Sequence, residues 1–251
     1  MSVAPPIRVH VLDGGQIHGY DASDLADDGA YEGRKVDLPA PCFLIRHPDG
    51  DLMWEGGISA SRTDLEDAVS HGSDLTEQLG MLGVTPEEIR FLSVSHGHWD
   101  HSGNAGLFAS STWIVNPHER AAMFDDESRA TQAMDDYGAL EAARTLLISD
   151  DYDVFGDGSV RIIQSPGHTV GHTVLLVHLA VGGPILLSGD LWHLAESREQ
   201  RRVPPFNFDR TQTLASMDKV EELVAATGAR VVIQHEADDI AALPRFPDSL
   251  A

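Results

Sequence analysis

Cysteine is almost absent from this chain of 251 residues, in which Cys42 is the single example. No intrachain disulfide is therefore possible, and because Cys42 lies in the apolar run at residues 42–45, we expect it to be a small core residue. Long apolar runs are also missing, so no segment is predicted to span a bilayer. Residues 1–6 lack the basic patch and apolar core of a signal peptide, and we expect a cytoplasmic protein without membrane contacts.

Basic residues are scarce as well. The chain carries 17 Lys and Arg residues against 40 Asp and Glu residues, a formal net charge of −23. Such a field repels phosphate backbones, which disfavours a nucleic acid as partner. The simplest role of the surplus carboxylates is to keep the surface solvated, so the charge argues against one class of partner without identifying another.

The remaining composition is that of an ordinary globular protein. Hydrophobic residues make up 42% and charged residues 23% of the chain, which is enough for a sizeable core. A chain of this length forms one large domain or two small ones, and it contains no internal repeat and no linker-like segment of low complexity. We therefore predict a single α/β domain over residues 1–251.

Hydrophobic periodicity divides the chain into strands and helices. The segment at about 13–38 is rich in aspartate and glycine, and we predict a long irregular excursion there, either functional or an arm of a homodimer. Strands are predicted at residues 7–12, 42–46, 52–54, 91–94, 112–115, 160–163, 174–179, 185–188 and 231–233, and helices at about 61–80, 117–124, 130–146 and 209–227.

The densest group of potential metal ligands follows the apolar run at 91–94. His96, His98, Asp100 and His101 lie there within six consecutive positions. In an extended backbone alternate side chains point the same way, so His96 and His98 project together. Imidazole and carboxylate groups are the ligands that zinc takes. This motif after a strand favours a metal site over a solvated polar loop or a pair of core histidines. Four such groups also exceed what one tetrahedral site takes from one segment, which makes two adjacent metals plausible.

Three further candidate ligands lie far away in the sequence but share one property. His168, Asp190 and His235 each follow the carboxyl end of a predicted strand, as His96 and His98 do. Open α/β sheets place their ligand sites at such strand ends. We therefore expect these residues to converge at one edge of the fold.

The motifs His96-x-His98-x-Asp100-His101, Gly167-His168-Thr169 and Ser188-Gly189-Asp190, with the strand-terminal His235, resemble the metallo-β-lactamase superfamily. The resemblance covers essentially the whole chain and implies an α/β fold, an αββα sandwich with a dinuclear metal site at one edge. It also implies the ligand sets: His96, His98 and His168 for one metal, Asp100, His101 and His235 for the other, and Asp190 between them. Zinc is the leading candidate for both divalent ions, although cobalt, iron and manganese fit the same donors.

Within that superfamily, the length, the motif spacing and residues 38–42 look most like the N-acyl homoserine lactonases. This resemblance implies a quorum-quenching enzyme that opens the lactone ring of a small-molecule bacterial signal. A hydroxide shared by the two metals would attack the carbonyl. Asp100 is then the candidate for orienting the water or carrying its proton to the leaving alkoxide.

Two positions depart from the lactonase pattern. Glu55 stands where many members have a supporting aspartate, and His193 stands three residues after Asp190, where the lactonases carry a tyrosine. His193 is either a catalytic hydrogen-bond donor to the substrate or a residue that supports the metal site. We assign no chemical role to His118 and Glu119, which belong to the helix predicted at 117–124.

Other activities of the same fold are alternatives. They include another lactonase or an esterase, for example one acting on a pyridoxine-derived lactone, and a glyoxalase II-like thioesterase. The short acidic tail after His235 weakens the thioesterase alternative, which would carry a basic C-terminal region. A non-catalytic or redox module of flavodiiron type is disfavoured by the histidine-rich ligand set. An acyl chain would need an apolar groove, and the aromatic residues near the ligand loops either line it or pack in the core: Trp99, Trp192, Phe206 and Phe208.

Overall fold

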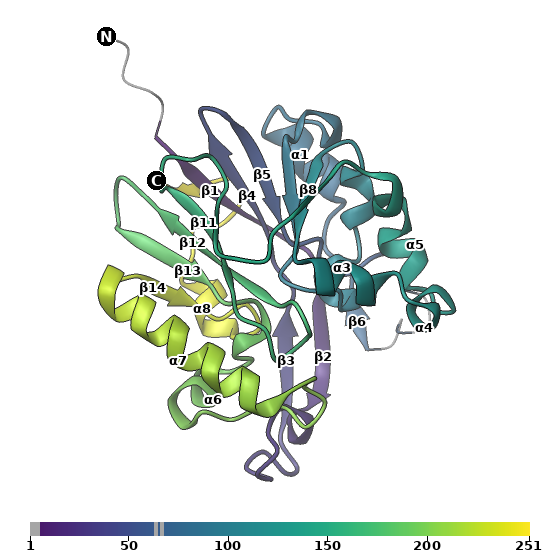
Figure 1. Cartoon of the computed structure of the whole chain (residues 1–251), viewed down its shortest axis with the longest axis vertical. Coiled ribbons are helices and arrows are strands. Elements are labelled where there is room, and N and C mark those ends of the chain that lie inside the picture. Colours follow the sequence, from purple (N-terminus) through teal and green to yellow (C-terminus); the bar gives the residue numbers. More distant parts are fainter. Residues whose placement is uncertain (1–5, 63–64, 66–67) are drawn as a thin grey trace.

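The computed structural model describes residues 6–62, 65 and 68–251. Two β-sheets lie face to face, with α1 (Leu75–Met81), α3 (Pro117–Met123) and α5 (Ala133–Tyr137) outside one sheet and α7 (Arg210–Thr227) outside the other (Figure 1). This is the predicted αββα sandwich. None of the described helices is long and apolar enough to cross a membrane.

The first sheet has the strand order β15-β1-β4-β5-β7-β8-β9. The hairpin β4–β5 is confirmed, with Phe43 opposite Trp54. From β5 onward the neighbours run parallel, so β5, β7 and β8 end at the same edge. The strands are β15 (Ser249–Leu250), β1 (Arg8–Leu12), β4 (Cys42–His47), β5 (Gly50–Trp54), β7 (Phe91–Ser93), β8 (Thr112–Val115) and β9 (Thr145–Leu147).

The second sheet has the order β10-β11-β12-β13-β14. Its strands β10, β11, β12 and β13 are antiparallel, whereas β13 and β14 run parallel and bring Leu187 level with Val232. The strands are β10 (Tyr152–Asp153), β11 (Val160–Gln164), β12 (Thr173–His178), β13 (Pro184–Leu187) and β14 (Arg230–Val232).

The core has three layers because the central strands are buried on both faces. Phe43 and Ile45 of β4 pack between the two sheets, whereas Cys42 and Leu44 face the helices outside the first sheet. Continuous apolar runs, rather than alternating ones, are the pattern expected for such strands. Outside the second sheet, α7 contributes Met217 to a third cluster.

Several sequence predictions are wrong in detail. The segment at 13–38 contains paired strands, β2 (Gln16–Asp21) and β3 (Lys35–Pro39), which form a small third sheet with β6 (Val69–Ser70). Its scattered apolar residues gather only when these strands pair, as Ile17 does with Leu38. The same β6 replaces part of the helix predicted at 61–80, of which residues 63–64 and 66–67 lie outside the described part.

One more predicted helix is shorter than expected. The helix predicted at 130–146 consists of α5, a 3₁₀ turn at Gly138–Ala142 and then strand β9. Several short elements were not predicted at all, among them α6 (Ala195–Gln200), α8 (Ala237–Ala241) and β15. Short segments carry too few turns of periodic pattern to be identified without their tertiary partners.

Candidate metal centre

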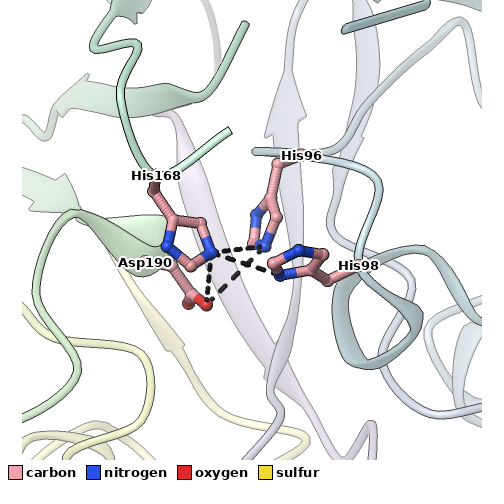
Figure 2. Close-up of side chains that lie close together, drawn as sticks. All are labelled: His96, His98, His168 and Asp190. Carbon is pink, nitrogen blue, oxygen red and sulfur yellow. Dashed lines mark hydrogen bonds and ion pairs between the residues drawn. The ribbon is translucent and has the colours of Figure 1, made fainter. Parts of the chain in front are cut away.

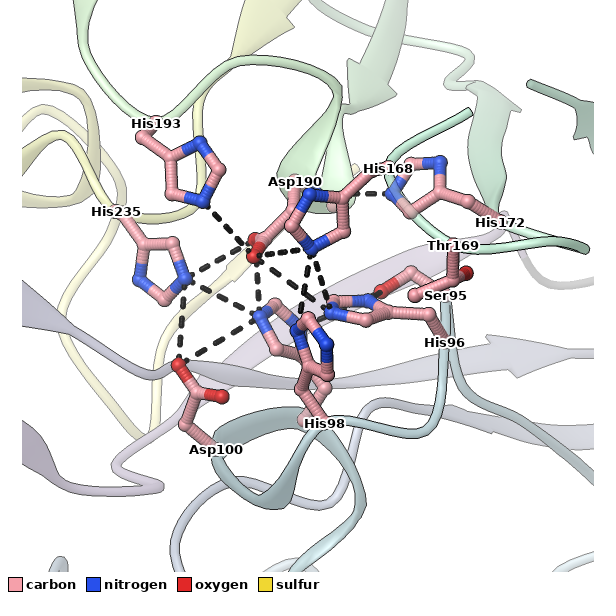
Figure 3. A network of polar contacts seen from close by, with 12 residues as sticks. Ser95, His96, His98, Asp100, His168, Thr169, His172, Asp190, His193 and His235 are labelled. Carbon is pink, nitrogen blue, oxygen red and sulfur yellow. Dashed lines mark hydrogen bonds and ion pairs between the residues drawn. The ribbon is translucent and has the colours of Figure 1, made fainter. Parts of the chain in front are cut away.

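The predicted ligands come together at one edge of the sandwich (Figure 3). His96 and His98 follow β7, and the short helix α2 (Trp99–Ser102) then carries Asp100 and His101. The other three follow the ends of strands in the second sheet: His168 after β11, Asp190 after β13 and His235 after β14. The convergence predicted from strand ends is therefore what the fold produces.

The first cluster contains His96, His98, His168 and Asp190 (Figure 2). Nε2 of His168 lies 3.2 Å from Nε2 of His96, 3.2 Å from Nδ1 of His98 and 3.2 Å from Oδ2 of Asp190. A tetrahedral zinc ion with bonds of about 2.0–2.1 Å keeps its ligand atoms about 3.3 Å apart. The donor atoms therefore have the spacing that one such ion requires.

The second cluster contains Asp100, His101 and His235. The Nε2 atoms of His101 and His235 are 3.1 Å apart, and Oδ2 of Asp100 lies 3.8 Å from the first and 3.5 Å from the second. Oδ1 of Asp190 lies 3.0 Å from both Nε2 atoms. The two carboxylate oxygens of Asp190 thus face different clusters, as the bridging role requires.

Hydrogen bonds on the outer side of the imidazoles orient them inward. Nδ1 of His168 donates to Oδ1 of Asn207, and Nδ1 of His235 donates to the carbonyl oxygen of Pro39. In the neutral rings, the inward Nε2 atoms therefore carry lone pairs. Oδ1 of Asp190 is also buried without a hydrogen-bond partner among the described residues. Lone pairs and an unpaired carboxylate oxygen that converge in this way fit a bound cation.

The electrostatics of the two clusters differ. Burial lowers the pKa of His96 well below its usual value, and burial with the nearby His168 lowers that of His98 to about 3. Burial also opposes protonation of His101 and His235, but the Asp190 carboxylate with its acidic neighbours outweighs it and raises the pKa of both. His96 and His98 are thus neutral imidazoles, the form that binds a metal.

Glu55 supports the second cluster, at the position where the sequence departs from the usual aspartate. It is fully buried and adopts a left-handed backbone conformation with φ of 70°. Its carboxylate accepts from the backbone N–H of Ser95 and from Nε2 of Gln234, and Oε1 lies 3.4 Å from Nδ1 of His101. The longer side chain of glutamate therefore still reaches the metal-site loop.

His193 points toward the clusters from beside Asp190 (Figure 3). Its Nε2 lies 3.1 Å from Oδ2 of Asp190, and its ring stacks on that of His235 with centroids 5.7 Å apart. Burial lowers the pKa of His193 despite the adjacent carboxylate. The side chain is therefore in place to offer a neutral N–H group to the site.

A cavity of about 210 Å³ opens onto both clusters, and His98 of the first cluster lines it. One side is polar, with Asp100, Asp190, His193 and His235. The other side is apolar, and most of its residues belong to the segment at 13–38 that is predicted to be irregular: Ile17, Tyr20, Leu25 and Leu38, with Trp99 and Phe206.

Phe206 also lines a neighbouring groove of about 550 Å³, together with the exposed Phe208. Of the four aromatic candidates, Trp99 and Phe206 thus line the cavity and Phe208 the groove. Trp192 does neither, because it is a core residue with 1% of its surface exposed. Its bulk fills the space between the second sheet and α7.

Two positioning residues were missed in the sequence. Asn207 orients His168, and its own amide is fixed because Nδ2 donates to Oγ1 of Thr213. His172 accepts a hydrogen bond from the backbone N–H of Asp190. The repeated Gly-His-Thr at 167–169 and 171–173 was the one available signal for His172. Asn207 had none, because its role depends on a contact between residues 39 positions apart.

Residues 36–235 match the family model of the metallo-beta-lactamase superfamily. The chain belongs to this superfamily. It is 30% identical over 247 residues to a protein named N-acyl homoserine lactonase AttM from Rhizobium johnstonii, covering 92% of this chain and 93% of that protein.

Solved structures of lactonases share the fold. A crystal structure of a quorum-quenching N-acyl homoserine lactone lactonase superposes with a TM-score of 0.83 at 23% identity, over 100% of this chain and 99% of that one. A structure of AidC, a dizinc quorum-quenching lactonase in complex with a product, superposes with a TM-score of 0.70 at 15% identity, over 94% and 90% of the two chains.

Proposed function

We propose that this protein hydrolyses the lactone ring of N-acyl homoserine lactones at a centre of two divalent metal ions. The observation that carries the proposal is the pair of ligand clusters that share Asp190 and open into a cavity with one apolar wall. The named activity of the relative from Rhizobium johnstonii supports the choice of substrate.

The metal ligands follow from the two clusters. We assign His96, His98 and His168 to one ion, Asp100, His101 and His235 to the other, and Asp190 to both. Zinc suits this mixture of imidazole and carboxylate donors. When bound, two such ions supply a hydrolytic nucleophile at neutral pH and polarise the substrate carbonyl.

The protein's own groups handle the proton. Asp100 lines the cavity and is the carboxylate at the site whose oxygens are not shared between clusters. In this proposal Asp100 accepts the proton of the attacking water. It then delivers that proton to the ring oxygen, which is the leaving alkoxide. His193 lines the same cavity and donates a hydrogen bond to the substrate, in the place of the tyrosine of other lactonases.

The shape of the cavity suits an uncharged amphiphilic lactone. Its polar side faces the ester, and its apolar side, with Leu25 and Trp99, accepts the methylene groups of the ring and the first part of the acyl chain. A longer chain leaves past Phe206 into the outer groove beside Met123 and Val170. The acidic surface is no obstacle, because the substrate carries no phosphate.

The test is proton release at constant pH on mixing the metal-analysed protein with acyl homoserine lactones of several chain lengths. We expect turnover that adds one water to the lactone, with about two metals per chain. A His98→Ala variant is the blank. Two bound metals without hydrolysis of acyl homoserine lactones would contradict the substrate assignment. Pyridoxine-derived lactones, simple esters and thioesters would then be tested as substrates.

We also propose that residues 1–251 form one domain, because strands of both sheets contribute to the same core cluster. Homodimer formation and a cytoplasmic location stay predictions.

A further inference from the structure

The three histidines of the first cluster come from two loops that belong to different sheets. His96 and His98 follow β7 of the first sheet, whereas His168 follows β11 of the second. The distances between these donor atoms must hold to within about 0.2 Å for the three histidines to bind one ion. Some contact between the loops must therefore fix their relative position.

Glu119 makes that contact. Oε1 of Glu119 accepts a hydrogen bond of 2.8 Å from the backbone N–H of Gly97. Oε2 accepts one of 2.7 Å from Oγ1 of Thr169 and one of 2.9 Å from the backbone N–H of Gly171. Gly97 lies between His96 and His98, and Thr169 follows His168, so one carboxylate joins both ligand loops at the ligands' immediate neighbours.

We propose that Glu119 is a positioning residue that sets the geometry, and hence the metal affinity, of the first cluster. This inference rests on the proposed metal centre but not on which lactone is hydrolysed. Glu119 belongs to neither ligand cluster. It acts through the two loops.

The helix that carries Glu119 is itself anchored to the second sheet. Asn116 caps α3 by accepting from the backbone N–H of His118, and its Nδ2 donates to Oε1 of Gln164 at the end of β11. The carboxylate is therefore held by a short helix tied to the strand that leads to His168.

Close packing leaves the loops little freedom around this helix. A Cβ atom at Gly171 would lie 2.7 Å from Cβ of Glu119, and one at Gly97 would lie 2.6 Å from Cγ of Met123. Both loops thus need glycine where they meet α3. The approach is close enough for direct hydrogen bonds to a single side chain.

A buried carboxylate needs such partners. Glu119 is 3% exposed, and an unpaired ionised carboxylate in that position would be strongly destabilising. Burial raises the pKa of Glu119, while the hydrogen bonds from Thr169, Gly97 and Gly171 oppose that effect. Both oxygens have donors, so the group joins the loops without leaving a polar atom unsatisfied.

The second cluster has separate supports. His101 is supported by Glu55, and His235 by the carbonyl oxygen of Pro39, and neither contact involves Glu119. Loss of the Glu119 carboxylate is therefore expected to affect one cluster more than the other. A merely structural role would affect both clusters together.

The test is Glu119→Gln, with metal affinity as the readout. The glutamine amide has one acceptor and one donor group, so in either orientation its NH₂ faces a backbone N–H of one loop. Zinc is titrated against a competing chelator in the apoprotein, and the two binding phases are assigned with His98→Ala and His235→Ala. We expect the zinc affinity of the phase assigned to the first cluster to fall by about 10- to 100-fold. The zinc affinity of the other phase should change by less than about 3-fold.

Two further variants make the result specific. Glu127→Gln removes the same charge from α4 (Asp126–Arg129) on the same side of the site, and among the described residues Glu127 has no hydrogen bond to either loop. It should leave both phases unchanged. Thr169→Val keeps the carboxylate and both backbone bonds, so it should weaken the same phase as Glu119→Gln, by less.

Cobalt spectra provide a second readout that does not depend on activity. The visible bands of Co²⁺ in the first cluster should shift in Glu119→Gln and stay as in the parent protein in Glu127→Gln. Unchanged phases and spectra in Glu119→Gln, or an equal loss in both phases, would overturn the inference. If the parent protein opens no lactone, the proposed function is wrong. The metal measurements still test the role of Glu119, because they do not depend on turnover.

Discussion

The backbone N–H of Asp190 donates a hydrogen bond of 3.0 Å to Nε2 of His172, and both residues are buried. The proton of this imidazole is therefore on Nδ1, which faces Ser165. Burial lowers the pKa of His172 well below its usual value, which keeps the ring neutral and Nε2 an acceptor. His172 thus holds the backbone of the residue that both metal clusters share.

Replacement of this imidazole should loosen the Asp190 loop. His172→Ala leaves a buried backbone N–H unpaired and opens a cavity, and we expect the free energy of unfolding to fall by about 2–4 kcal/mol. Urea denaturation of the apoproteins measures it. The exposed His71 gives a matched histidine-to-alanine control, which should change stability by less than about 0.5 kcal/mol.

Stability should also depend on pH through Asp136. Burial raises the pKa of this carboxyl to about 6, with Arg62 opposing the effect. The raised pKa means that the folded state binds the proton more tightly than the unfolded chain. Its contribution is fully present below the usual carboxyl pKa and is lost as the pH rises through about 6.

Asp136→Asn removes this titration. The stability of the variant relative to the parent protein should therefore increase between pH 4 and pH 8, as measured by urea denaturation at each pH. Asp135→Asn, at the exposed neighbouring position, is the control and should show no such trend. A constant difference for Asp136→Asn across the pH range would contradict the assignment.

The catalytic role of His193 is tested by a pair of substitutions. His193→Phe keeps the ring stacked against His235 but removes the hydrogen-bond donor, and we expect kcat to fall about 100-fold with metal content unchanged. His193→Tyr brings back a donor and should recover much of that loss. If the phenylalanine variant instead loses metal and keeps its turnover per metal, His193 is a support for Asp190 rather than a donor to the substrate.

Phe206 should influence the choice of acyl chain. Its ring lies between the cavity and the outer groove and is 46% exposed, so a long chain can cover it whereas a short one cannot. Phe206→Ala should lower kcat/KM for a ten-carbon chain by about 10-fold, equivalent to about 1.4 kcal/mol of lost apolar contact. The four-carbon substrate serves as the internal control, and an equal loss for both chains would argue against this path.

Removal of the metals should weaken the fold as well as abolish turnover. Without cations the carboxylates of Asp100 and Asp190 lie among histidines whose lone pairs converge. Each ion that binds only the folded state stabilises it by about 2.7 kcal/mol at a free concentration of 100 Kd. We expect a lower Tm after chelation and recovery with zinc, and a Tm unaffected by chelator would contradict two structural ligand clusters.

Much of the site was predictable because its ligands are local signals. His96, His98, Asp100 and His101 follow one strand within six residues, so their proximity depends on backbone geometry alone. His168, Asp190 and His235 could be added because each follows a strand, and strand ends of an open α/β sheet meet at one edge. The αββα sandwich was implied by the resemblance of these motifs to the metallo-β-lactamase superfamily, whereas the hydrophobic periodicity by itself predicted only a single α/β domain.

Sequence alone thus determined the chemistry of this protein: a histidine and carboxylate centre at the strand ends of an α/β sandwich. Tertiary structure decided what surrounds it. Only pairing of β2 with β3 brings Ile17 and Leu38 to the cavity wall, and only the packing of α3 places Glu119 between two ligand loops. These relationships join residues from 21 to 50 positions apart, and no local pattern of propensity or spacing encodes them, because they arise when separate elements pack together.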